Sequence, residues 1–241
     1  MVEVTELKIG EQHLKKFKKI RDLFLSKTEV PTKDNWKTMD NNEIWLTVVR
    51  QAMVVGSSAS VEKMEDNKRL ENWFYKVLSY NRLKRIKNEE KVREIIQKTL
   101  YRLGTRYYAN KAKFLTYNFR ILKTFKGGPK NMIKQVSELD SDKLKIGSII
   151  GTFRYMKHKS ARDFLMTLGV LENAVAFDTR VASIFKKVGI KLPRGFAEKK
   201  ELYEEVEHEV LDKICKQLEI SGVQFDRLLY QKMDEIKKTK L

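Results

Sequence analysis

The segment KHKSARDFLMTLGVLENAVAFDTRV, residues 157–181, decides the fold class and holds the candidate chemistry. Lys159 opens a predicted helix that Gly169 closes, and a short apolar connection then leads to Asp178 at the start of the next helix. A basic turn, Arg154 to His158, comes directly before the first of these helices. The order of turn, helix, connection and helix predicts a helical hairpin with a functional group at each helix start.

Lys159 and Asp178 are the candidate reactive pair. The positive end of the helix dipole lowers the pKa of an amine at a helix start and favours its neutral, nucleophilic form, whereas it keeps a carboxylate at an N-cap ionised. An amine and an anion together can attack a sugar carbon and stabilise a cationic transition state. We therefore expect Lys159 to act as a nucleophile and Asp178 as an anion.

Outside this segment the chain also shows helical periodicity. Its 241 residues contain only three prolines and eleven glycines, and we expect an all-α protein of about ten helices. Ser221 and Gln224 form a capping box for the last helix, and Gly127-Gly128-Pro129 is the clearest break in the chain. The further predicted helices span 11–26, 42–55, 60–78, 88–103, 109–124 and 142–152.

Breaks between helices suggest four segments along the chain. Residues 1–40 would form an N-terminal helical extension, and 41–150 a helical subdomain. Residues 151–189 hold the hairpin with Lys159 and Asp178, and 190–241 the C-terminal helices.

The charge of the chain indicates a polyanionic partner. Fifty Lys and Arg stand against 32 Asp and Glu, a net charge of +18. Basic clusters at 82–87, 106–134 and 154–159 predict phosphate-facing surfaces. Residues 198–212 instead hold seven acids and two lysines, so we expect this acidic helix to point away from them.

Cysteine and histidine are too scarce for most metal sites. Cys215 is the single cysteine, and only three histidines occur, which excludes an internal disulfide, a four-cysteine cluster and a histidine-only site. The N-terminal sequence MVEVTELKIG lacks the apolar core of a signal peptide, and no apolar run is as long as a bilayer span. We expect a cytoplasmic, nucleoid-associated protein without a signal peptide, membrane segment or metal.

Three stretches of the chain resemble one enzyme family. Lys159-Ser160-Ala161, Gly169 and Asp178-Thr179-Arg180-Val181 match the signature of the helix-hairpin-helix DNA glycosylases. The stretch GTRYYANKAK, residues 104–113, and the tail, residues 201–232, are similar to the archaeal-type 8-oxoguanine DNA glycosylases/AP lyases.

This resemblance implies two helical subdomains flanking a DNA-binding cleft. It also implies a bifunctional glycosylase and AP lyase that excises 8-oxoguanine from duplex DNA as a monomer and without a cofactor. Lys159 would attack C1′ of the sugar and form a Schiff base, and Asp178 would stabilise the oxocarbenium-like transition state. Two alternatives remain: a glycosylase for a mismatched thymine or uracil on the same scaffold, and a non-catalytic helical DNA-binding protein.

The resemblance also assigns seven further candidate residues. The hairpin lacks the glycines usual in the family, so its cationic side chains would replace backbone amides at a phosphate; the alternative is an exposed basic turn. A flipped base would meet an aromatic ring and a carboxylate in a pocket. The DNA-binding candidates are Arg154, Lys157, His158 and Arg180, and the base-pocket candidates are Gln51, Asp226 and Tyr230.

Overall fold

A computed structural model describes residues 7–241, and this part of the chain is all-α. Fourteen α-helices occur in it, with a few short 3₁₀ and π turns and without a β-strand. The fold class therefore confirms the sequence prediction. Within the same residues, no helix is both long and apolar enough to cross a bilayer.

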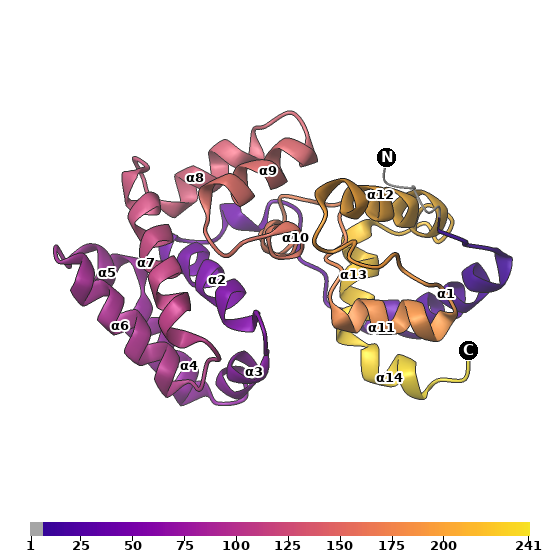
Figure 1. The fold of residues 1–241 in the computed structure, drawn as a ribbon, viewed down its shortest axis with the longest axis horizontal. Coiled ribbons are helices and arrows are strands. Elements are labelled where there is room, and N and C mark those ends of the chain that lie inside the picture. The colour runs from indigo at the N-terminus through magenta and orange to yellow at the C-terminus, as the bar shows by residue number, and fades with distance from the viewer. Residues whose placement is uncertain (1–6) are drawn as a thin grey trace. The chain divides into compact units, whose positions relative to one another are not determined.

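The chain forms two compact units (Figure 1). The continuous unit is Asp34–Lys157, and the discontinuous unit combines residues 7–33 with His158–Leu241. The division differs from the four predicted segments, because residues 7–33 of the expected N-terminal extension belong with the C-terminal half. Residues 1–6 of that extension lie outside the described residues.

The continuous unit is built around α2 (Asn41–Val54), the helix with the most buried residues in the described chain. Eight of its residues are buried, and the Trp45 Nε1 donates a 2.8 Å hydrogen bond to the Leu78 carbonyl. Phe119 packs edge-on against Trp45, with ring centroids 5.2 Å apart. The other helices are η2 (Asn35–Lys37), α3 (Ala59–Glu65), α4 (Lys68–Leu78), α5 (Tyr80–Lys84), α6 (Glu89–Arg102), α7 (Tyr108–Thr124), α8 (Pro129–Ser137) and α9 (Asp142–Thr152).

Side-chain caps define where several of these helices begin. Asp40 and Glu43 form a capping box at α2, and Ser141 caps α9. The helix predicted over 60–78 is two helices in the structure, because Asn67 accepts a hydrogen bond from the Leu70 amide and starts α4. Asn67 is a residue type that favours a helix start, but the apolar pattern continues through 60–78 and predicts a single helix there.

The discontinuous unit packs its helices around aromatic side chains. The ring centroid of Phe17 lies 5.5 Å from that of Phe185 and 5.3 Å from that of Phe225. The N-terminal helix therefore shares one core with two C-terminal helices. The Ser221–Gln224 capping box is confirmed. The helices are α1 (Glu11–Phe24), η1 (Leu25–Lys27), α10 (His158–Thr167), α11 (Thr179–Val188), α12 (Lys200–Val210), the π turn η3 (Leu211–Cys215), α13 (Gly222–Gln231) and α14 (Met233–Lys238).

Candidate active site

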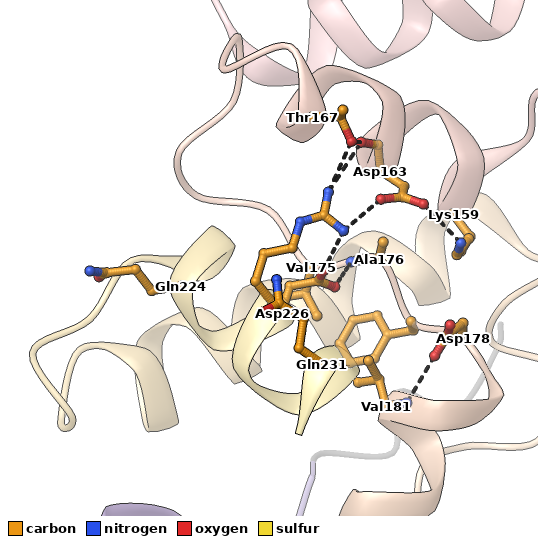
Figure 2. A network of polar contacts seen from close by, with 12 residues as sticks. Lys159, Asp163, Thr167, Val175, Ala176, Asp178, Val181, Gln224, Asp226 and Gln231 are labelled. Carbon is orange, nitrogen blue, oxygen red and sulfur yellow. Dashed lines mark hydrogen bonds and ion pairs between the residues drawn. The ribbon is translucent and has the colours of Figure 1, made fainter. Parts of the chain in front are cut away.

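Lys159 lies in the first turn of α10, as the sequence predicted. Its Nζ is 3.1 Å from the Asp163 carboxylate one turn further along the same helix, and its side chain remains 28% exposed (Figure 2). Gly169 ends this segment with a φ of 68°, and the Val170 amide donates to the Leu165 carbonyl at 2.9 Å. The Lys159 side chain is therefore partly exposed at a fixed helix start.

The charge state of Lys159 differs from the prediction. Burial disfavours the ammonium form, but the carboxylates of Asp163, Asp178 and Asp226 outweigh this effect and raise the pKa of Lys159 above its usual value. The expected lowering rested on the helix dipole alone. A full negative charge at 3.1 Å outweighs the partial charge of a helix end.

Asp178 occupies the N-cap of α11, as predicted. Its Oδ1 accepts hydrogen bonds from the Arg180 amide at 2.8 Å and the Val181 amide at 2.9 Å. Figure 2 shows it at the start of α11, on the same side of the polar cluster as Lys159. The discontinuous unit therefore holds the two predicted reactive groups at one side of the same polar cluster (Figure 2).

A second cation shares the carboxylate of Asp163. Arg227 on α13 places its Nη1 2.8 Å from the Asp163 Oδ1, and its Nη2 donates to the Thr167 Oγ1 at 3.1 Å. Burial raises the pKa of Asp163, but Lys159 and Arg227 more than compensate and lower it to about 2. Asp163 is therefore ionised at neutral pH, although its side chain is only 14% exposed. Sequence reasoning assigned no role to Asp163 or Arg227.

The base-pocket candidates Asp226 and Tyr230 differ in accessibility. Asp226 is only 2% exposed, its Oδ1 accepts a 2.8 Å hydrogen bond from the Ala176 amide, and burial raises its pKa to about 7. Tyr230 is half-buried, and the Arg180 guanidinium lies over its ring, 4.7 Å from the centroid. In this structure, Asp226 holds the backbone that leads to Asp178.

A buried ion pair holds α10 against α12. The Arg162 Nε and Nη2 donate to the two carboxylate oxygens of Glu207 at 2.6 to 2.8 Å, and the Glu207 Oε1 also accepts from the Val175 amide at 2.8 Å. The Tyr203 hydroxyl donates to the Val175 carbonyl and accepts from the Phe177 amide. These contacts fix the connection between α10 and Asp178.

One of the seven acids of the acidic helix, Glu207, is buried and does not belong to a solvated acidic face. Its position in the sequence could have predicted this burial, because Glu207 lies on the apolar face of α12. The buried residues of that face include Tyr203, Val206 and Val210. A charge on an apolar face requires a buried partner. Sequence periodicity alone does not identify that partner as Arg162.

The hairpin turn adopts a glycine-like conformation without a glycine. Tyr155 has a φ of 71°, in the left-handed region, and its ring packs against Phe114 with centroids 5.0 Å apart. Asn118 holds the turn, because its side chain accepts from the Arg154 amide at 2.8 Å and donates to the Arg154 carbonyl at 3.0 Å. Arg154 stacks on Tyr117, 4.3 Å from the ring centroid.

The remaining hairpin candidates differ in charge. Lys157 is exposed, whereas His158 is half-buried at the start of α10. Burial and the Arg162 cation lower the pKa of His158, so its imidazole is mainly uncharged at neutral pH. Arg154 and Lys157 therefore supply the positive charge among these three residues.

Gln51 lies on α2 and belongs to the continuous unit, whereas Lys159 belongs to the discontinuous unit. It is buried, and its Oε1 has no hydrogen-bond partner within the described residues. Nearby, the fully buried Lys111 donates to the carbonyls of Met53 and Val55, and burial lowers the pKa of Lys111 to about 8. Lys111 thus holds the loop after α2, a role that sequence reasoning missed.

Comparisons with known proteins identify the fold. No family model matches the chain, and a search of curated proteins finds no match. The chain is similar to the structure of the 8-oxoguanine DNA glycosylase of Methanocaldococcus jannaschii, with a TM-score of 0.66, 15% identity and coverage of 96% of this chain and 99% of that chain. The structure of the Methanocaldococcus jannaschii 8-oxoguanine glycosylase/lyase in complex with a 15mer DNA containing 8-oxoguanine matches with a TM-score of 0.65, 15% identity and coverage of 92% and 98%.

A bacterial enzyme gives the same result. The 8-oxoguanine DNA glycosylase of Thermotoga maritima matches with a TM-score of 0.62, 18% identity and coverage of 91% of this chain and 95% of that chain. The chain therefore has the fold of these 8-oxoguanine DNA glycosylases, as the resemblance of its sequence implied.

Replacing Arg162 with Met tests the buried ion pair. The change leaves the Glu207 carboxylate buried without its cation, and we expect a loss of about 3 to 5 kcal/mol in the free energy of unfolding. Urea denaturation followed by circular dichroism measures it. The control Arg93→Met removes an exposed pair with Glu90, worth about 0 to 1 kcal/mol. Equal losses in the two variants would contradict the role given to Arg162.

Proposed function

We propose that the chain is a bifunctional DNA glycosylase and AP lyase that removes 8-oxoguanine from duplex DNA. One observation carries the proposal: a partly exposed lysine at the start of α10 and a capping carboxylate at the start of α11 lie together in a fold shared with three 8-oxoguanine glycosylase structures. The net charge of +18 supports a DNA partner.

In the proposed reaction, the damaged nucleotide is flipped out of the duplex. The neutral Lys159 amine forms a bond to the sugar C1′ while the bond from C1′ to the base breaks, and the released base takes up a proton. The Asp178 carboxylate stabilises the positive charge that develops on the sugar. The C1′–O4′ bond of the adduct then breaks, O4′ takes up a proton and the nitrogen forms a Schiff base with C1′. Loss of a proton from C2′ expels the 3′ phosphate by β-elimination and cleaves the strand. These steps require no metal or organic cofactor.

Contacts of Asp178 match the role of a fixed anion. Two backbone amides donate to its Oδ1, which limits the rotation of the carboxyl group. Asp226, Glu207 and Tyr203 hold the three residues that precede it through hydrogen bonds to their backbone. An anion held this way stabilises positive charge without reorganising during the reaction.

Lys159→Gln tests the nucleophile. We expect excision of 8-oxoguanine and borohydride trapping of a protein-DNA adduct to disappear, because the variant has no amine at this position. DNA affinity should remain nearly unchanged, since only one of 50 cationic side chains is removed. Trapping and binding titrations on duplexes with 8-oxoguanine, mismatched thymine and uracil measure both effects and the lesion preference. Normal base release by the variant would exclude Lys159 as the nucleophile.

Asp178→Asn separates catalysis from folding. Asn remains a good N-cap, so we expect the free energy of unfolding to change little. Single-turnover excision should slow by about two to four orders of magnitude, because the fixed negative charge is removed. Urea denaturation and single-turnover kinetics on the same preparation compare the two effects. An unfolded variant would instead indicate that Asp178 serves the fold.

The double change Arg154→Ala and Lys157→Ala tests the hairpin. We expect a similar decrease in affinity on damaged and undamaged duplex, because binding to phosphates carries no lesion identity. The slope of log affinity against log salt should become shallower by about 0.9 for each phosphate that the protein no longer binds. Binding titrations at several salt concentrations measure it. The control Lys27→Ala with Lys33→Ala removes two exposed cations elsewhere, and an equal change there would refute a specific role of the hairpin.

A further inference from the structure

Two cations share the single carboxylate of Asp163. Lys159 contacts its Oδ2 at 3.1 Å, and Arg227 contacts its Oδ1 at 2.8 Å. The Asp163 side chain is only 14% exposed, so its negative charge depends on these partners more than on water. The proposed reaction needs a neutral Lys159. Asp163 must then lose the positive charge of one of its two cationic partners.

Loss of the Lys159 proton would be costly in a simple lysine-aspartate pair. It would leave the Asp163 carboxylate with little water and no cation, and a charge in that state is strongly destabilising. Arg227 removes this difficulty because its guanidinium stays charged at any pH at which the protein is folded. It is also held in place, since its side chain is 12% exposed and its Nη2 donates to Thr167.

We propose that Arg227 is a positioning residue for Lys159. The Arg227 guanidinium holds the Asp163 carboxylate, so that this carboxylate keeps a cationic partner when Lys159 releases its proton. Asp163 orients the Lys159 side chain along α10, and Arg227 limits how strongly this carboxylate retains the ammonium. The Lys159 side chain is 28% exposed, so the proton passes to water. The inference rests on the proposed function and refines it by naming what regulates its nucleophile.

Other charged groups around Lys159 also act on its titration, and each test variant leaves them in place. Besides Asp163 and Arg227, they come from the start of α11 and from α13. Those facing Lys159 or its partners are Asp178, Arg180, Asp226 and Tyr230.

The proposal predicts opposite effects of two single substitutions. In Asp163→Asn the ammonium loses its anion, and the pKa of Lys159 should fall by about one to three units. In Arg227→Gln the anion has Lys159 as its main partner, and the pKa of Lys159 should rise by about one unit. Arg227→Lys retains the positive charge and should remain near wild type. A role limited to the stability of the fold would not move the pKa of Lys159 in two directions.

Competitive labelling with dinitrofluorobenzene measures this pKa without DNA. The pH dependence of labelling at the Lys159 peptide, read by mass spectrometry, gives the midpoint for the full-length protein and each variant. Asp212→Asn is the matched control, because it changes the same group in the exposed pair with Lys216 and should leave the Lys159 midpoint unchanged. Thermal unfolding identifies any variant that fails to fold.

Each result decides the proposal. Shifts in opposite directions support it, whereas unmoved midpoints or shifts in one direction overturn it. If Asp163→Asn does not fold, the difference between Arg227→Gln and Arg227→Lys decides alone. The labelling result is independent of excision, so opposite shifts in a protein without glycosylase activity would refute the proposed function and retain the inference. Normal excision with unmoved labelling midpoints would instead refute the inference and leave the proposed function in place.

Discussion

The buried pair of Arg162 and Glu207 is the interaction on which the candidate site depends. The Glu207 carboxylate accepts hydrogen bonds from the Arg162 guanidinium on α10 and from the Val175 amide in the connection to Asp178. It therefore joins two helices and a loop. Removing two charges from water is expensive, and only good geometry with further hydrogen bonds offsets that cost. The pair meets both conditions. Its main effect is therefore on geometry, because it holds α10, which carries Lys159, against the connection that leads to Asp178.

Neighbouring residues of α10 bind different helices. Arg162 pairs with Glu207 on α12, whereas Asp163 pairs with Arg227 on α13. Since adjacent helical residues point in directions about 100° apart, the two ion pairs fix the rotation of α10 about its axis. Lys159 lies one turn before Asp163 and on nearly the same face. The direction of its amine thus follows from interactions that a single helix cannot provide.

Local sequence signals predicted much of this arrangement. The periodicity and caps located most helices, and the spacing of Lys159, Gly169 and Asp178 placed both reactive groups at helix starts. The long-range pairs were not predictable in the same way. Arg162 and Glu207 are 45 residues apart, and one sequence shows which charges lie on apolar faces but not which of them meet. For the same reason, the docking of α1 in the C-terminal core was missed.

The charge of Lys159 shows how tertiary contacts override a local rule. A helix start contributes a partial positive charge worth about 0.3 to 1 kcal/mol, which disfavours an ammonium. A carboxylate within hydrogen-bonding distance shifts a pKa by about one to three units, and each unit is worth about 1.4 kcal/mol. The anion therefore dominates, and the resting lysine is an ammonium held in place. A nucleophile at this position needs a way to lose that proton, and sharing of the Asp163 carboxylate by a second, permanently charged side chain provides one.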